Sequence, residues 1–186
     1  MGTLAYAVTV SLDGYAADAD GDFQWTGPSS DVFDVHVERM AEVSTEVLGR
    51  RTYALMGYWD DYPDDDGTPA EREFARRWRA VDKVVASSTL TPGELGPGSV
   101  RLVPDLDLDQ LRRIVDAAPG VVEIFGPTLA APAIRAGMVD EFHLFVVPKL
   151  VGGGLRALPD GVDLDLTLAG HRVFGDGLVY LRYRAG

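Results

Sequence analysis

The chain has 186 residues, of which 46% are hydrophobic and 25% charged, the composition of an ordinary globular protein with one domain. It contains no cysteine, which excludes disulfides, thiolate metal sites and cysteine nucleophiles and favours a cytoplasmic location. No apolar run approaches the roughly 20 residues of a membrane span, and the N-terminus lacks the basic segment of a signal peptide. We therefore expect no membrane partner.

The formal net charge of −12 argues against nucleic acid or an anionic membrane as the main partner. A single anionic small molecule can still bind wherever arginines gather. Lys83 and Lys149 are the only lysines among the 17 basic residues. A cationic clamp would therefore consist mostly of guanidinium groups, which suit bidentate recognition of phosphate.

The spacing of apolar residues predicts the elements of the fold in chain order. The expected strands cover residues 3–10, 46–48, 82–87, 99–103, 121–125, 142–147, 164–168 and 178–183. The expected helices cover residues 31–43, a short stretch from 49, 69–80, 106–117 and an Ala-rich stretch after 126. Residues 11–27 form a long connection rich in turn residues, which is more often functional than idle. This order predicts one α/β domain over residues 1–186, with a mostly parallel sheet and an antiparallel hairpin at its C-terminal edge.

Three of the expected strands run into residues that can hold phosphate. The segments are Gly49-Arg50-Arg51-Thr52, Ser87-Ser88-Thr89 and Gly126-Pro127-Thr128. Because the carboxyl ends of parallel strands share one edge of a sheet, we expect glycine amides, hydroxyls and arginines to converge there. Arg50 or Arg51 together with Ser88 can hold a 2′-phosphate. Each segment alone can equally be a turn with a capping residue, and neither a G-x-G-x-x-G nor a G-x-x-x-x-G-K-[ST] motif occurs.

These segments also carry a resemblance that covers nearly the whole chain. SLDGY at 11–15, GRRTY at 49–53, SSTL at 87–90, FGPTL at 125–129 and the run from AGMVDEF to GGG at 136–154 resemble the dihydrofolate reductase-like superfamily. Within it, they are most similar to the C-terminal reductase domain of the bifunctional riboflavin-biosynthesis deaminase-reductase. The resemblance implies a three-layer αβα reductase that uses NADPH to transfer hydride to a pteridine- or pyrimidine-like heterocycle. It also implies a homodimer.

The resemblance assigns roles to individual residues. Those it places at the cofactor are Gly49, Arg50, Arg51, Thr52, Ser87, Ser88, Thr89, Gly126, Pro127, Thr128 and Leu129. Those it places near the nicotinamide and the substrate are Ser11, Leu12, Asp13, Trp25 and Phe125. No metal site is expected, and the zinc site of the deaminase half has no cysteine to build it.

Two residues depart from the family pattern. Pro127 stands where the family usually has the second residue of Gly-Gly, and in folate reductases that peptide bond is cis. Because a cis bond costs least before proline, we predict a cis Gly126–Pro127 bond. The alternative is a trans proline just before a helix, and Pro132 can then be the first helical residue. Phe125 stands where riboflavin-pathway members tend to carry glutamate, and the nearest acid, Glu123, lies two residues earlier on the same face of the strand.

Hydride transfer to an imine needs an acid or an ordered water near the accepting nitrogen, and the candidates for that acid are Asp13, Asp31 and Asp34. Asp31 can equally be a first-turn helix charge, and Asp13 can simply initiate a turn. Two other functions stay open. The first is a non-catalytic nucleotide- or ligand-binding module on the same fold. The second is an oligomeric scaffold in which an exposed apolar edge at residues 142–147 forms a dimer surface.

Overall fold

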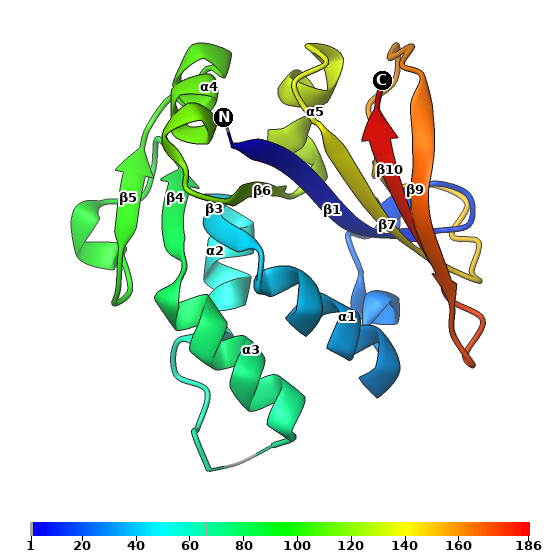
Figure 1. The fold of residues 1–186 in the computed structure, drawn as a ribbon, viewed down its shortest axis with the longest axis horizontal. Helices are drawn as coiled ribbons and strands as arrows, with labels where there is room; N and C mark the ends of the chain where they lie inside the picture. The colour runs from blue at the N-terminus through cyan, green and yellow to red at the C-terminus, as the bar shows by residue number, and fades with distance from the viewer. Residues whose placement is uncertain (1, 66) are drawn as a thin grey trace. The chain divides into compact units, whose positions relative to one another are not determined.

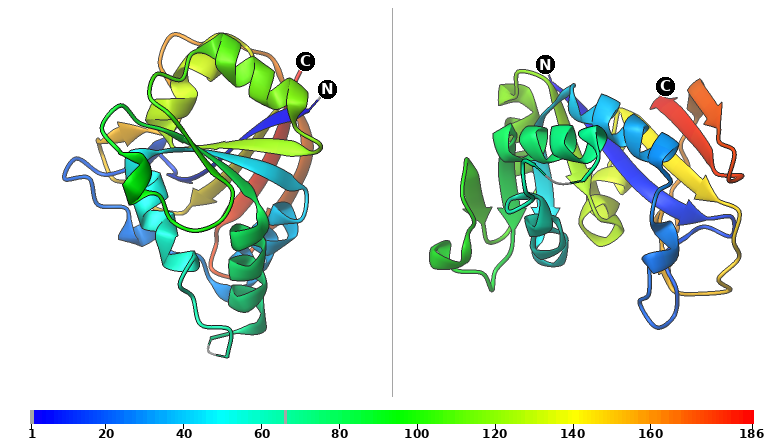
Figure 2. Two further views of the ribbon diagram at one scale, coloured as in Figure 1. Left: turned by 90° about the vertical axis from the view of Figure 1, so that its left-hand side faces the viewer. Right: turned by 90° about the horizontal axis from the view of Figure 1, so that it is seen from below.

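The computed structural model describes residues 2–65 and 67–186. Helices and strands alternate along much of the chain (Figures 1 and 2), as expected for an α/β protein. The chain divides into two compact units, which we describe separately. The first unit comprises Gly2 and Ser30–Glu123, and the second comprises Thr3–Ser29 and Ile124–Gly186. The boundary falls within strand β6 (Val121–Phe125).

The first unit is built on parallel strands. Its strands besides the start of β6 are β3 (Val43–Gly49), β4 (Asp82–Ala86) and β5 (Val100–Val103). Its helices are α1 (Ser30–Met40), α2 (Arg50–Met56), α3 (Pro69–Ala80) and α4 (Leu108–Ala117), with 3₁₀ turns η2 (Gly57–Trp59) and η3 (Pro92–Glu94). Strand β4 pairs in parallel with β3 on one side and β5 on the other. Parallel pairing places the carboxyl ends of these strands at one edge.

Helix α3 shows how the sequence sets an element's limits. Its N-cap Thr68 accepts a hydrogen bond from the Glu71 amide through Oγ1 at 3.2 Å. The Thr68 amide donates in return to the Glu71 carboxylate at 2.7 Å, which completes a capping box, and Pro69 occupies the first helical position. Phe74 and Trp78, four positions apart on this helix, are both buried and form its inward face.

The second unit carries a mixed set of strands. They are β1 (Thr3–Ser11), β7 (Glu141–Val147), β9 (Leu166–Val173) and β10 (Val179–Ala185), besides the end of β6. Its other elements are the short strands β2 (Tyr15–Ala17) and β8 (Leu155–Arg156), the 3₁₀ turn η1 (Gln24–Thr26) and helix α5 (Pro127–Arg135). Strand β7 runs parallel to β1, whereas β10 is antiparallel to both β7 and β9. The α/β class with a mostly parallel sheet and an antiparallel C-terminal hairpin is therefore confirmed.

The predicted exposed edge at residues 142–147 is wrong. Strand β7 is hydrogen-bonded to β1 on one side and to β10 on the other, and its Phe142 and Phe145 are buried. An apolar run of this kind also occurs in a strand that has a hydrogen-bonded neighbour on each side, as β7 has. The open strand of this unit is β9, whose Leu166 and Leu168 side chains are 37% and 49% exposed.

One helix limit also differs from the prediction. The helix expected over residues 31–43 ends at Met40, and Val43 already begins β3. Apolar spacing continued across this boundary because the first residue of a buried strand is apolar as well. Within residues 2–65 and 67–186, no helix is both long enough and apolar enough to cross a membrane.

Candidate functional site

In the first unit, two of the predicted phosphate-binding segments meet. Gly49 at the end of β3 is in register with Ala86 at the end of β4. The segments that follow these residues are joined by a hydrogen bond of 2.9 Å, in which Arg50 Nη1 donates to Thr89 Oγ1. The structure therefore brings together a cation and a hydroxyl from two strand ends that the sequence separates by 39 residues.

We call the two segments that meet here, residues 49–52 and 87–89, the corner. Ser87 shapes its backbone. Its side chain is buried, and Oγ accepts from the amides of Thr89 at 3.2 Å and Leu90 at 3.1 Å. This is the geometry of a Ser-type turn, which shapes the chain after β4. The neighbouring Ser88 is exposed, so its hydroxyl is accessible to a ligand.

Helix α2 opens the other side of the corner. Its N-cap is Gly49 in an extended conformation (φ −79°, ψ 163°), and glycine has no side chain with which to cap the first amides of the helix. Arg51 is exposed, and Thr52 is half-buried. Helix amides, a guanidinium and hydroxyls are the groups that bind phosphate.

One residue of this corner went unpredicted. Tyr53 is buried, and its hydroxyl accepts a hydrogen bond of 2.7 Å from the Gly96 amide. It thereby ties α2 to the loop after η3. The sequence signal was present, because Tyr53 ends the GRRTY motif, but its partner lies 43 residues away.

In the second unit, the turn from β6 into α5 depends on Gly126. Its φ of 104° lies in the region that L-residues avoid, so glycine is needed at this position. The Gly126–Pro127 bond is trans, and the cis prediction is wrong. Gly126 itself makes the turn, after which Pro127 enters the helix at its first position, where a missing amide proton costs nothing. Pro132 lies inside the helix and is not its first residue.

The remaining residues of this turn are accessible to different degrees. Thr128 is exposed, whereas Leu129 and Phe125 are half-buried. The Ala130 amide donates to the Gly126 carbonyl at 3.0 Å, which closes the first turn of α5. The Gly126 N-cap has no side chain, so it resembles the start of α2 in leaving early amides available.

The end of β1 forms a dense set of hydrogen bonds around Asp13. Ser11 Oγ donates to Asp13 Oδ1 at 2.6 Å, and the amides of Val151 and Gly152 donate to the same carboxylate at 3.2 Å and 2.7 Å. The Ser11 hydroxyl, followed by the two amides, lowers the pKa of Asp13 to about 2. At neutral pH this carboxylate is ionised and occupied as an acceptor, which does not favour Asp13 as the proton donor.

The other predicted substrate residues are less constrained. Leu12 is 66% exposed, and its amide donates to the Lys149 carbonyl at 2.8 Å. Trp25 lies in η1, half-buried, with Nε1 donating to the Asp22 carbonyl at 3.0 Å. Asp31 belongs to the first unit, where it is exposed in the first turn of α1. The roles of these residues in binding or proton transfer stay predictions.

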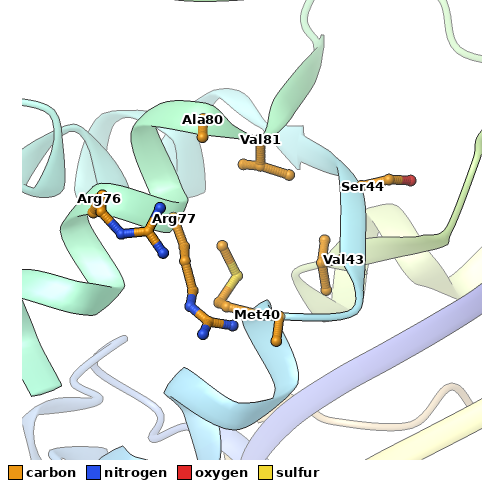
Figure 3. A pocket seen from close by; sticks show the side chains of 8 residues that line it. Met40, Val43, Ser44, Arg76, Arg77, Ala80 and Val81 are labelled. Atoms are coloured by element: carbon orange, nitrogen blue, oxygen red, sulfur yellow. The ribbon is translucent and has the colours of Figure 1, made fainter.

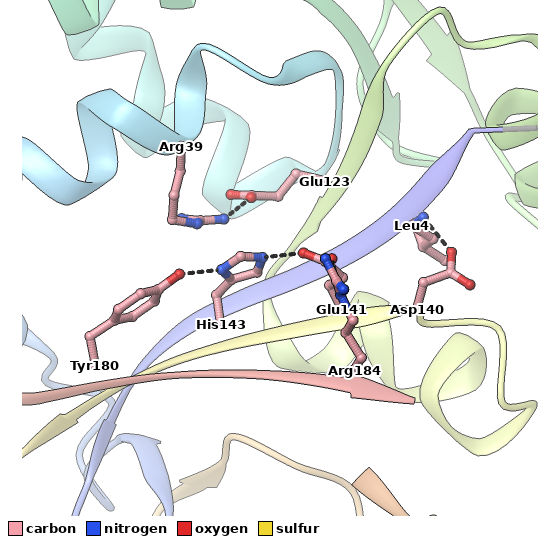
Figure 4. Close-up of polar contacts among 8 residues, drawn as sticks. All are labelled: Leu4, Arg39, Glu123, Asp140, Glu141, His143, Tyr180 and Arg184. Atoms are coloured by element: carbon pink, nitrogen blue, oxygen red, sulfur yellow. Dashed lines mark hydrogen bonds and ion pairs between the residues drawn. The ribbon is translucent and has the colours of Figure 1, made fainter. Parts of the chain in front are cut away.

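Glu123 serves the interior of the first unit. It forms a buried ion pair with Arg39 of α1 (Figure 4). Glu46 of β3 is also buried, and burial, followed by the charge of Glu123, raises its pKa well above the ordinary value. These carboxylates belong to a buried charge cluster, so Glu123 does not replace the family glutamate at the position of Phe125.

A hollow of about 380 Å³ lies elsewhere in the first unit, lined by Met40, Ala41, Val43, Ser44, Arg76, Arg77, Ala80 and Val81 (Figure 3). It lies at the start of β3, whereas Gly49 is at the end of that strand. None of the predicted site residues lines it. Both arginines are engaged by one carboxylate, Glu73, at 2.7 and 2.5 Å.

The described residues contain no group of three or more histidine, cysteine, aspartate or glutamate side chains placed to hold a metal ion. The groups that converge at strand ends are instead guanidinium, hydroxyl and helix amides. Many α/β proteins hold phosphate groups with residues of this kind at the ends of parallel strands.

The chain belongs to the RibD C-terminal domain family, whose model matches residues 3–180. It is 23% identical over 178 residues to the uncharacterized protein YyaP of Bacillus subtilis, a match that covers 95% of this chain and 91% of YyaP. It is 26% identical over 157 residues to the riboflavin biosynthesis protein RibD of Mycobacterium tuberculosis. That match covers 84% of this chain but 45% of RibD, so the chain spans about half the length of that relative.

Solved structures agree on the fold. A riboflavin biosynthesis protein from Shewanella sp. PV-4 superposes with a TM-score of 0.73 at 23% identity and covers 99% of both chains. Dihydrofolate reductase from Enterococcus faecalis, solved with NADP(H), gives a TM-score of 0.64 at 17% identity, covering 100% of this chain and 97% of that one. At these identities the likeness shows the fold alone, and that fold is the one the resemblance to dihydrofolate reductase-like proteins implied.

Proposed function

We propose that the protein is an NADPH-dependent reductase that transfers hydride to a pteridine- or pyrimidine-like heterocycle. The observation that carries this proposal is the hydrogen bond from Arg50 to Thr89. It joins two segments that the family resemblance assigns to the cofactor. Membership in the RibD C-terminal domain family supports the reductase class.

The residues of the first unit suit the adenosine end of NADPH. Arg50 and Arg51 supply charge for a 2′-phosphate, and Ser88 and Thr89 supply hydroxyls beside it. Such a clamp distinguishes NADPH from NADH, because the 2′-phosphate is the group in which the two differ. Gly49 and Thr52 at the start of α2 bind phosphate through the helix amides and a hydroxyl.

The family resemblance assigns residues of the second unit to the pyrophosphate, the nicotinamide and the substrate. The N-cap Gly126 is followed by Pro127, Thr128 and Leu129 in the first turn of α5, where the amides of Thr128 and Leu129 can bind a pyrophosphate and the Leu129 side chain can contact the nicotinamide. Leu12, Trp25 and Phe125 offer apolar surface to a flat heterocycle. NADPH, when bound, supplies the hydride, and the protein supplies position and electrostatics.

Proton delivery falls to Asp31 or to a water, because the Asp13 carboxylate is occupied by three donors, the Ser11 hydroxyl and the amides of Val151 and Gly152. The loss of NADPH absorbance, measured with dihydrofolate and with the ribosylaminopyrimidine substrate of riboflavin synthesis, tests the proposal. We expect steady oxidation with one of these substrates. The Arg50→Ala variant tests the role of this arginine in the same assay. It should lose most of the oxidation rate at low NADPH concentration.

A specific observation keeps a second function open. Phe125 stands where riboflavin-pathway members tend to carry glutamate, so this position supplies no polar anchor for a substrate. The protein would then be a nucleotide- or ligand-binding module. Binding of NADPH without turnover on both substrates would favour the module over the reductase.

We also propose a homodimer and a cytoplasmic location. For the dimer, the exposed apolar side chains Leu168 and Val173 of β9, 49% and 67% exposed, offer an uncharged surface on a strongly acidic chain. Light scattering should give twice the chain mass for the wild type. The Leu168→Glu/Val173→Glu variant should give a monomer, and an unchanged mass would remove β9 from the interface.

A further inference from the structure

The sequence GGG at residues 152–154 has the composition of a phosphate-binding loop, but two amides of this loop are already engaged. Val151 and Gly152 both donate to Asp13, the latter at 2.7 Å across 139 positions of sequence. An intramolecular carboxylate thus occupies the place that an anion would take. The loop is therefore held by a carboxylate of the same chain.

Further contacts fasten the same loop to the segment after β1. The Leu12 amide donates to the Lys149 carbonyl at 2.8 Å, and the Ala157 amide donates to the Gly14 carbonyl at 3.0 Å. Tyr6 Oη of β1 donates to the Ala157 carbonyl at 2.6 Å. Strands β2 and β8 continue these contacts, with Tyr15 paired to Arg156 and Ala17 to Leu155. Residues 149–157 thus lie against residues 11–17 along their length.

The approach at Gly154 is so close that no side chain fits. A Cβ atom there would lie 2.2 Å from the Ala17 carbonyl oxygen, and φ is 126°. Backbone atoms cannot move aside as a flexible side chain can. Gly154 and Asp13 therefore fix the loop at its two ends.

We propose that Asp13 is a positioning residue, whose carboxylate holds the glycine loop Val151–Gly154 on the end of β1 and thereby sets the position of Leu12 against the bound ligand. This inference rests on the proposed function for the identity of that ligand. Ser11 assists, because its hydroxyl donates to Asp13 and accepts from the Tyr15 amide at 3.0 Å. Leu12, between the two, is left with its side chain 66% exposed.

The charge of Asp13 matters for this role. A carboxylate accepts hydrogen bonds only, so both oxygens can face the Ser11 hydroxyl and the two amides at once. An asparagine side chain at this position would keep one oxygen but turn an NH₂ group toward donors. The Asp13→Asn variant should therefore hold the loop less well than the wild type, and the Asp13→Ala variant should not hold it.

The test measures amide hydrogen exchange at Val151 and Gly152 in the ligand-free chain, together with the NADPH dissociation constant by fluorescence. In Asp13→Ala we expect exchange at both amides to accelerate by about tenfold or more and the NADPH dissociation constant to rise by a similar factor. Asp13→Asn should fall between. Asp176→Ala is the matched control, because the Asp176 carboxylate accepts from the Leu178 amide at 3.0 Å rather than from the glycine loop.

The possible outcomes distinguish the role of Asp13 in holding the loop from the proposed NADPH-dependent function. Unchanged exchange in Asp13→Ala would overturn the proposed hold on the loop, and faster exchange with an unchanged NADPH dissociation constant would overturn the positioning role. A wild-type chain that does not bind NADPH, but whose loop exchange still responds to Asp13→Ala, would contradict the proposed function and support the hold on the loop. Equal effects from Asp176→Ala would show that the change is not specific, which also overturns the inference.

Discussion

The two compact units stabilise their polar groups in opposite ways. In the first unit, charged side chains lie in the interior: Lys83 is 1%, Glu46 4% and Glu123 6% exposed. In the second unit, the Asp13 carboxylate is accessible and is satisfied by backbone amides of a glycine loop. The first unit should therefore be sensitive to the loss of a charge, and the second to a change in backbone geometry.

The second unit also contains a polar chain across its strands, made only of side chains. The Tyr180 hydroxyl contacts His143 Nδ1 at 2.7 Å, and Arg184 Nε donates to Glu141 at 2.9 Å (Figure 4). Glu141 lies 3.4 Å from His143 Nε2, which links the two pairs. Cross-strand pairs of this kind stabilise neighbouring strands by modest amounts. They differ from the first unit's cluster because Arg184 reaches solvent.

The largest expected effect comes from removing the buried cation of the first unit. Lys83 Nζ donates to the Trp78 carbonyl at 2.6 Å and lies near the charges of Asp60 and Glu46. Lys83→Met should lower the free energy of unfolding by about 3 kcal/mol, because carboxylates are left without a counter-charge. Chemical denaturation measures this loss. Lys149→Met, at an exposed lysine, is the control and should change little.

Gly154→Ala should have the next largest effect, by forcing residues 149–157 away from residues 11–17. The new Cβ would meet backbone atoms of Ala17 and Asp18 within 2.5 Å, so we expect a loss of about 2 kcal/mol or more. Gly153→Ala is the matched control, because nothing lies within 4 Å of its Cβ. Thermal unfolding of the two variants compares them, and equal melting temperatures would refute the close approach.

The Arg50 clamp should have an effect of intermediate size on binding. Arg50→Ala removes a charged hydrogen-bond donor, so NADPH affinity should fall about tenfold while NADH affinity changes little. Arg51→Ala is the neighbouring comparison, and the arginine whose loss removes the NADPH preference is the one that holds the 2′-phosphate. Isothermal titration calorimetry with both cofactors measures the ratio of the NADH and NADPH dissociation constants. A preference that survives both substitutions would exclude the corner formed by Arg50 and Thr89.

The smallest expected effect concerns pH and the buried Glu46. Its folded-state pKa lies well above the ordinary 4.5, so its contribution to stability is greatest below pH 4.5 and declines as pH rises toward the folded pKa. Glu46→Gln should flatten this decline and raise stability by about 1 kcal/mol at neutral pH. Chemical denaturation of the wild type and the variant at a series of pH values measures both effects. A larger decline in the variant would contradict the account.

The contribution of Asp13 to stability depends on pH with the opposite sign. Its folded-state pKa of about 2 lies below the ordinary 3.8, so its contribution is present above pH 3.8 and is lost as pH falls toward 2. The hold of Asp13 on the glycine loop should therefore persist throughout the neutral range.

The sequence predicted the strand ends well, because parallel strands leave a local signature of apolar residues followed by glycine and hydroxyls. Gly49, Ser87 and Gly126 each lie directly after a strand or at its end. Their partners were not predictable in the same way. Asp13 reads as a local turn in sequence, and its partners in the glycine loop lie 138 and 139 positions away.

The cis prediction failed for a local reason. It was carried over from a Gly-Gly pattern, in which neither residue fixes φ. In this chain Pro127 fits the first helical position, and Gly126 alone adopts the positive φ that makes the turn. The prediction of an exposed edge at residues 142–147 failed because the apolar run of a strand does not reveal whether the strand has one neighbouring strand or two.

Binding of NADPH through its 2′-phosphate is tested by a side-by-side titration of the wild-type chain with NADPH and NADH. We expect NADPH to bind more tightly by about tenfold or more. Equal affinities, or no binding of either cofactor, would contradict it.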